Sequence, residues 1–113
     1  MSERKRAPKR TGQKDPGKKN PDHEVSGILR HCGHHVVIDT DSDYLYIGKL
    51  LGVSGAYITL GEADVHDRRE SSSMNEKYVL ESKKYGVRSN RREVHLQSHR
   101  IVSYSLLEDV IDY

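Results

Sequence analysis

The densest group of potential metal ligands lies near residue 33, where His31, Cys32, His34 and His35 supply imidazole and thiolate groups. Such groups suit zinc or copper, but their spacing matches no zinc-binding pattern. His34 and His35 are neighbours on a predicted strand and point to opposite faces, whereas Cys32 belongs to an apolar helical stripe, and free cysteine is usually buried. We therefore expect structural or surface roles, with no metal and no cofactor. A small metalloprotein that uses the three histidines is the alternative, which metal analysis would test.

Three carboxylates alternate just beyond this group, at Asp39, Asp41 and Asp43. Their spacing is superficially that of a calcium-binding loop, but the glycine and the closing glutamate of such a loop are missing. We interpret the segment as a solvated turn between two strands.

Nucleophilic catalysis has little support in the sequence. No nucleophile elbow surrounds any serine, and the segment Gly52-Val53-Ser54-Gly55 is too short for a phosphate-binding loop and lacks its lysine. A reactive thiolate needs an electropositive, partly exposed setting, which the apolar stripe around Cys32 does not offer. The sequence therefore predicts a protein that is not an enzyme.

Binding of nucleic acid has more support, because the charge is divided unevenly. The chain holds 19 basic and 17 acidic residues, a formal net charge of +2. Residues 1–20 carry eight basic and two acidic side chains, whereas the other 93 residues carry eleven and fifteen. With only Met1 and Ala7 apolar, residues 1–20 are predicted to form a disordered basic tail. Such a tail attracts phosphates without regard to sequence.

A second basic cluster is predicted around the fourth strand, at Arg88, Arg91, Arg92 and Arg100. Tyrosine, histidine and arginine side chains supply the stacking and hydrogen-bonding groups that single-stranded bases need. The alternative is that the tail serves solubility or nuclear targeting and that the arginines lie on an ordinary solvated loop.

The elements that position these side chains are one helix and five short strands. Val25, Ile28, Leu29 and Cys32 form an apolar stripe, which predicts an amphipathic helix over 21–32 that ends at Gly33. All seven aromatic residues are tyrosine, so Val, Ile, Leu and Tyr must build the core, a composition that favours strands. The strands are predicted at 34–38, 44–51, 56–60 continuing toward 65, 93–97 and 100–105, with a bend or bulge at Gly48.

A polar insert at about 67–92 separates the third strand from the fourth. Ser73 and Glu76 have the spacing of a capping box, Lys83 and Lys84 fall in the last turn, and Gly86 can end a helix. A second helix is therefore predicted over about 74–84, with Met74, Tyr78 and Tyr85 on one side.

Several classes of protein are excluded by composition. No apolar run approaches the roughly 20 residues of a membrane span, and no apolar h-region follows the N-terminal charges, so we expect no secretory signal. A single cysteine cannot form an internal disulfide. We expect a basic tail at 1–20 and one domain at 21–113, located in the cytoplasm or, in a eukaryote, in the nucleus.

The order of these elements resembles the Sm/Lsm family of small RNA-binding proteins, over about residues 21–107. The segment 35–38 precedes the aspartate-rich turn, Gly48-Lys49-Leu50 supplies the Gly-x-Leu of the first Sm motif, and residues 94–104 fit the frame of the second. The resemblance implies a mainly β protein. Its fold would be a five-stranded SH3-like or Sm-like barrel with an N-terminal helix and a partly helical insert between strands three and four. Ile47, Leu50, Ile58, Leu60, Leu96 and Ile101 would fill the barrel.

The resemblance also implies a site for single-stranded RNA. Ser54 stands where the family has an aspartate, Tyr57 falls near its asparagine, and Gln97-Ser98 replaces its Arg-Gly. Six residues at these positions are the predicted RNA contacts: Ser54, Tyr57, Gln97, Ser98, His99 and Arg100.

Family members are typically hexameric or heptameric rings, so the resemblance implies self-association through strands four and five. The insert could instead cover an edge of the sheet. The alternative function is a protein-interaction module, an SH3-like barrel without specific RNA binding that docks a protein partner through the insert at 67–92.

Overall fold

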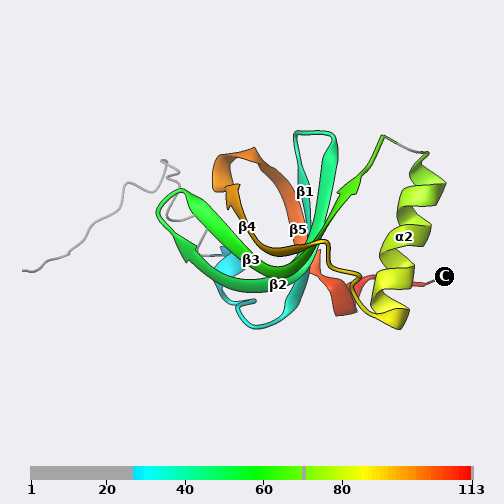
Figure 1. Cartoon of the computed structure of the whole chain (residues 1–113), viewed down its shortest axis with the longest axis horizontal. Helices are drawn as coiled ribbons and strands as arrows, with labels where there is room; N and C mark the ends of the chain where they lie inside the picture. Colours follow the sequence, from blue (N-terminus) through cyan, green and yellow to red (C-terminus); the bar gives the residue numbers. More distant parts are fainter. Residues whose placement is uncertain (1–26, 70, 113) are drawn as a thin grey trace, which may run out of the picture.

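A computed structural model describes residues 27–69 and 71–112. The predicted tail at 1–20 and most of the predicted helix at 21–32 therefore lie outside the described residues. Residues 27–29 are helical and lead through a turn into the first strand. The elements that follow are β1 (His35–Thr40), β2 (Tyr44–Ser54), β3 (Tyr57–Asp67), α2 (Ser72–Tyr85), β4 (Arg91–Gln97) and β5 (Ile101–Leu106) (Figure 1). All five predicted strands are thus confirmed, and no helix of the described part is long and apolar enough to cross a membrane.

The strands form one antiparallel sheet in the order β4-β3-β2-β1-β5. The long strands β2 and β3 curve strongly, so that the sheet curls into an open barrel (Figure 1). The register of β2 against β3 shifts between Ile47 and Lys49, which confirms the irregularity predicted at Gly48. A side chain at Gly48 would bring a Cβ atom within 3.0 Å of the Ala63 Cβ.

The main hydrophobic core lies inside the curl of the sheet. It contains Ile28, Val36, Ile38, Leu50, Ile58, Leu60, Ala63 and Leu96, and Ile101 packs against it. Ile28 comes from the predicted apolar stripe, but Leu29 is 46% exposed and Cys32 is also exposed. The prediction of a buried Cys32 was wrong because the chain leaves the helix after residue 29, so the helical period no longer sets the direction of Cys32.

A second core lies on the outer face of β1 and β2. It is formed by Val37, Leu45, Ile47 and Leu107, against which Tyr78, Val79, Val87 and Val110 pack. Alternate residues of a strand point to opposite faces, so Val36 and Ile38 enter the main core while Val37 enters the second. The prediction that Ile47 fills the barrel was wrong, because α2 covers the face to which Ile47 points.

The helix α2 confirms the helix predicted at 74–84 and extends it at both ends. Its N-cap is Ser71, whose hydroxyl accepts a hydrogen bond from the Met74 N–H at 3.3 Å. Its C-cap is Gly86, at a φ of +98°, where glycine is favoured. The prediction that Met74, Tyr78 and Tyr85 form one apolar face of this helix was wrong in part, because Met74 and Tyr85 are 51% and 82% exposed. Tyr78 packs against the second core together with Val79.

Candidate nucleic-acid interface

Two turns meet at one end of the curled sheet. The turn between β2 and β3 is Gly55-Ala56, and the connection between β4 and β5 is a 3-10 turn at Ser98–Arg100. The backbone N–H of Ser98 donates to the carbonyl of Ala56 at 2.7 Å, and Tyr57 lies opposite Gln97 in the register of β3 with β4. The structure therefore places all six predicted contacts on one surface, which we call the two-turn surface (Ser54–Tyr57 and Gln97–Arg100).

The side chains of this surface offer a ring, an amide and a second ring. Tyr57 is 48% exposed, and Gln97 and His99 are also exposed. None of these three side chains has a hydrogen-bond partner within the described part of the chain. A free aromatic ring and a free amide are the groups that bind unstacked bases by stacking and by hydrogen bonds. Their role in RNA binding stays a prediction.

Arg100 is held in place by the turn between β1 and β2. Its Nε donates to Asp41 Oδ1 at 2.6 Å, and the Asp41 N–H donates to the Arg100 carbonyl at 3.0 Å. The register of β1 with β5 pairs Thr40 with Ile101, so the topology brings the start of β5 beside this turn. Asp41 was missed by sequence reasoning, because the pairing of β1 with β5 has no signal within the turn itself.

Two further aspartates at this place, Asp39 near the end of β1 and Asp43 in the turn, are also paired with arginines. Arg68 Nη1 lies 3.0 Å from Asp39 Oδ1, and Arg69 Nη1 lies 3.9 Å from Asp43 Oδ2. Arg69 also donates to Asp67, and this hydrogen bond holds the pKa of Asp67 at about 2. The solvated turn predicted between two strands is therefore observed, and its exposed carboxylates form surface ion pairs that the sequence did not indicate.

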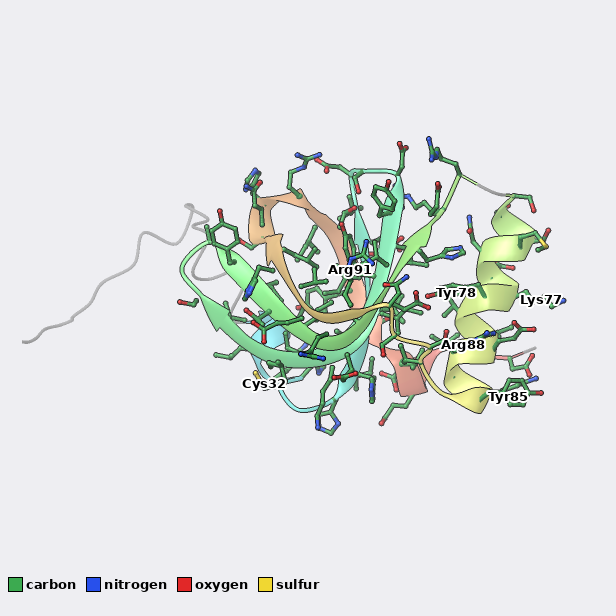
Figure 2. The ribbon with its side chains drawn as sticks, in the orientation of Figure 1. Cys32, Lys77, Tyr78, Tyr85, Arg88 and Arg91 are labelled. Atoms are coloured by element: carbon green, nitrogen blue, oxygen red, sulfur yellow. The ribbon has the colours of Figure 1, made fainter. Side chains whose placement is uncertain are left out.

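The predicted second basic cluster is divided by the length of a strand. Arg91 and Arg92 begin β4, whereas Arg100 follows its end, seven residues of strand and a turn away. Arg88 precedes β4 and lines a hollow beside α2 (Figure 2). Only Arg100 of the four arginines therefore belongs to the two-turn surface.

The histidines near Cys32 are placed separately. His31 contacts Tyr104 edge-to-face, with ring centroids 5.9 Å apart, whereas His34 and His35 are exposed. Among residues 27–69 and 71–112, no group of three or more His, Cys, Asp or Glu side chains is placed to hold a metal ion.

A buried polar cluster attaches α2 to β3. Asp64 is only 7% exposed and accepts hydrogen bonds from the Tyr78 hydroxyl and from Asn90 Nδ2, the latter at 3.1 Å. The ring of Tyr78 stacks on that of His66. Burial and the hydrogen bond to Asp64 raise the pKa of Tyr78 well above its usual range. This cluster fixes the insert against the sheet.

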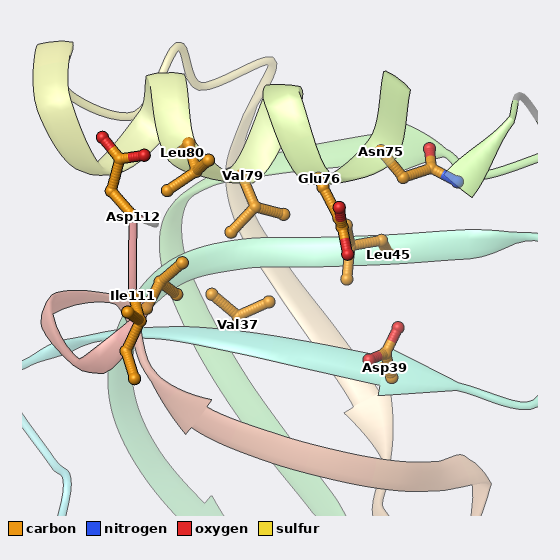
Figure 3. Close-up of a pocket in the computed structure, with 10 residues that line it drawn as sticks. Val37, Asp39, Leu45, Asn75, Glu76, Val79, Leu80, Ile111 and Asp112 are labelled. Atoms are coloured by element: carbon orange, nitrogen blue, oxygen red, sulfur yellow. The ribbon is translucent and has the colours of Figure 1, made fainter. Parts of the chain in front are cut away.

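A groove of about 470 Å³ runs between α2, the outer face of β1 and β2, and residues 110–112 (Figure 3). Lys83 donates to the Val110 carbonyl, and Lys84 forms an ion pair of 2.8 Å with Asp112, so the C-terminal segment is held to α2. The apolar lining is Val37, Leu45, Val79, Leu80, Val110 and Ile111, and the carboxylates at its margin are Asp39, Glu76 and Asp112.

Comparison with known proteins identifies the fold. No protein-family model matches the chain, and no curated protein matches its sequence. The structure is similar to that of a Sm protein of Pyrococcus abyssii solved in complex with a uridine heptamer. The TM-score is 0.50 at 13% identity, over 73% of this chain and 94% of the other. The fold is Sm-like. An Sm-like protein of Archaeoglobus fulgidus, AF-SM2, also aligns, with a TM-score of 0.45 and 19% identity over 79% of this chain and 96% of that one.

The Sm-like fold confirms the resemblance found in the sequence at the level of architecture. It accounts for the five antiparallel strands, and α2 lies between β3 and β4, where the insert was predicted.

Proposed function

We propose that this Sm-like chain is a non-enzymatic protein that binds single-stranded RNA on the two-turn surface. The observation that carries the proposal is the hydrogen bond between Ser98 and Ala56, which joins the two turns. It gathers on one surface an exposed ring at Tyr57, the charge of Arg100, and an amide at Gln97 that has no partner among residues 27–69 and 71–112. These groups provide stacking, hydrogen bonding to a base and attraction to a phosphate.

The basic tail has a separate role in this proposal. Residues 1–20 carry a net charge of +6 in the sequence, whereas the remainder of the chain carries −4. A basic arm attracts the RNA backbone in a way that depends on salt and not on base sequence. The tail therefore supplies affinity, and the two-turn surface supplies any preference among bases.

Association of several copies is also part of the proposal. In the described part of the chain, β4 pairs only with β3, and β5 pairs only with β1, so each has one free edge. Pairing of β4 of one copy with β5 of the next would add backbone hydrogen bonds between copies and would place several two-turn surfaces in one assembly.

Two measurements test this proposal. Filter binding of the full chain to an oligouridine and to an RNA of mixed sequence, each at two salt concentrations, should show binding that weakens with salt. Absence of binding at low salt would contradict RNA binding. The native mass of the purified chain should equal that of several copies of 12.9 kDa each. A native mass of one copy would contradict self-association.

A protein-interaction module is the second candidate function, and the groove beneath α2 favours it. The groove has an apolar floor, and the insert contributes one wall of it, with Asn75, Glu76, Val79 and Leu80. In this case Leu80→Asp should abolish capture of a protein partner, while deletion of residues 1–20 should leave capture unchanged. Lys77→Ala is the matched control, because Lys77 lies on the outer side of α2 (Figure 2).

A further inference from the structure

A hollow of about 250 Å³ lies between the start of β2 and the end of β4. Its lining residues are Thr40, Ser42, Tyr44, Tyr46, His95, Leu96, Gln97 and Arg100. It shares Gln97 and Arg100 with the two-turn surface, but Tyr57 does not line it. The hollow therefore adjoins the two-turn surface without being part of it, so an RNA strand bound at that surface would reach the hollow too.

The wall on the side of β1 and β2 is a fixed framework. The hydroxyl of Thr40 lies 2.6 Å from that of Ser42 and donates to the Tyr44 carbonyl at 3.0 Å. The Tyr44 N–H in turn donates to the Ser42 hydroxyl at 3.2 Å. These bonds set the backbone from which the Tyr44 side chain projects, so this wall is formed before any ligand binds.

The opposite wall carries groups that are still available to a ligand. The Gln97 amide, with two donors and an acceptor, has no partner within the described residues. Arg100 uses its Nε for Asp41, and neither of its Nη groups has a partner in that part of the chain. His95 is fixed differently, because its Nδ1 lies 2.9 Å from the Thr59 hydroxyl and its Nε2 lies 3.0 Å from Glu93.

The size and chemistry of the hollow fit one flat ring that carries polar edges. Its volume is below the roughly 300–1,000 Å³ of pockets for drug-sized ligands. Tyr44, Tyr46 and Leu96 offer apolar area, Gln97 offers hydrogen bonds, and Arg100 offers positive charge. A nucleotide, whose base is joined through ribose to a phosphate, uses all three. An aromatic side chain of a protein would leave the Nη groups of Arg100 without an acceptor.

We propose that this hollow binds one nucleobase of single-stranded RNA, next to the base held at Tyr57. The base lies against the ring of Tyr44, Gln97 bonds to its edge, and the Nη groups of Arg100 contact the adjoining phosphate. This inference rests on the proposed function and adds a second base site to it.

The test compares two probes, a fluorescein-labelled oligouridine and a base-free ribose-phosphate oligomer of the same length. Tyr44→Ala should weaken binding of oligouridine about fivefold or more, since stacking on an aromatic ring carries that much affinity. Binding of the base-free oligomer should not change. Tyr44→Phe should retain the affinity, and Tyr85→Ala is the matched control, because Tyr85 is 82% exposed on α2.

A second measurement uses the unmodified chain and so does not depend on the folding of a variant. Ultraviolet crosslinking of oligouridine that contains 5-bromouridine should label the peptide that carries Tyr44 as well as the peptide that carries Tyr57. Labelling at Tyr57 alone would overturn the proposal.

The outcomes separate this site from RNA binding as such. If wild-type protein fails to bind oligouridine, the proposed function itself is wrong. If Tyr57→Ala weakens binding and Tyr44→Ala does not, only the second base site is wrong; an aromatic side chain of a protein as the occupant would give this result. Equal losses of both probes in Tyr44→Ala would also overturn the second base site, because the effect would not depend on a base.

Discussion

The ring of Tyr78 lies almost parallel to that of His66, with centroids 3.7 Å apart and an interplanar angle of 9°. The same tyrosine donates its hydroxyl hydrogen to the buried carboxylate of Asp64. One side chain of α2 thus makes two different contacts with β3. Met74 and Tyr85 of α2 are exposed, so these polar and ring contacts of Tyr78 join the packing of Val79 in attaching the insert to the sheet.

Removal of the Tyr78 hydroxyl should destabilise the protein. Tyr78→Phe keeps a ring that can stack on His66 but leaves Asp64, which is 7% exposed, with Asn90 as its remaining side-chain donor. We expect the free energy of unfolding to fall by about 1–3 kcal/mol, the cost of an unsatisfied buried group. Urea unfolding measures the change, and Tyr85→Phe, at an 82% exposed position, should leave the midpoint unaltered. Equal midpoints for the two variants would contradict the role of the hydroxyl.

The same tyrosine predicts a loss of stability in alkaline solution. Burial, followed by the hydrogen bond to Asp64, raises the pKa of Tyr78 above the ordinary value of 10.0. The folded state therefore keeps this proton where the unfolded state releases it, so the contribution is complete below pH 10 and declines as the pH rises further. The unfolding midpoint of wild-type protein should fall more steeply above pH 10 than that of Tyr78→Phe. Parallel pH profiles would show that Tyr78 does not carry the effect.

Gly48 should tolerate no side chain, because β2 and β3 approach closely at the bend. A Cβ atom at this position would lie 3.0 Å from the Ala63 Cβ and 3.1 Å from the Ala63 Cα. Gly48→Ala should lower the free energy of unfolding by about 1–3 kcal/mol, as overpacking does. Gly52→Ala is the control on the same strand, since nothing lies within 4 Å of its Cβ position. A loss of similar size in both variants would indicate a cause other than contact with Ala63.

Arg100 should contribute one phosphate contact to RNA binding. Arg100→Gln should weaken binding of oligouridine and make the slope of log K against log salt shallower by about 0.7, the value for one contact with a single strand. Lys77→Gln removes the same charge from the outer side of α2, away from the two-turn surface (Figure 2), and should alter the slope less. If both variants have the same slope, Arg100 acts only through net charge.

Local patterns in the sequence were sufficient for the strands and for α2. Glycine at position 48 within an apolar run indicated the bend, and Gly86 after two lysines indicated where the helix ends. These features depend on the conformational preferences of a few neighbouring residues, and such preferences can be read without knowledge of the fold. The gathering of Tyr57 with Gln97 and Arg100 followed from the strand order that the resemblance supplied.

Features that depend on contacts between distant segments were not predictable in this way. Ile47 looks like a barrel residue until α2 is known to cover the opposite face of β2. Asp41 looks like a solvated turn residue until β5 is known to start beside it. In both cases the local structure was predicted correctly, as a strand around Ile47 and a turn around Asp41. The segment that contacts each residue, α2 or the start of β5, is one that no local pattern specifies.

The two free edges of the sheet belong to different strands with different side chains. The strand β4 begins with Arg91 and Arg92, whereas β5 presents Val102, which is 69% exposed. A contact that joins unlike edges is heterologous, so each added copy leaves the same pair of edges open at its ends. Addition of copies through such contacts stops only when the rotation from one copy to the next closes a ring, and otherwise a filament grows. In the proposed assembly, a small change of twist at one edge would therefore decide between a closed particle of fixed mass and a fibre of indefinite length.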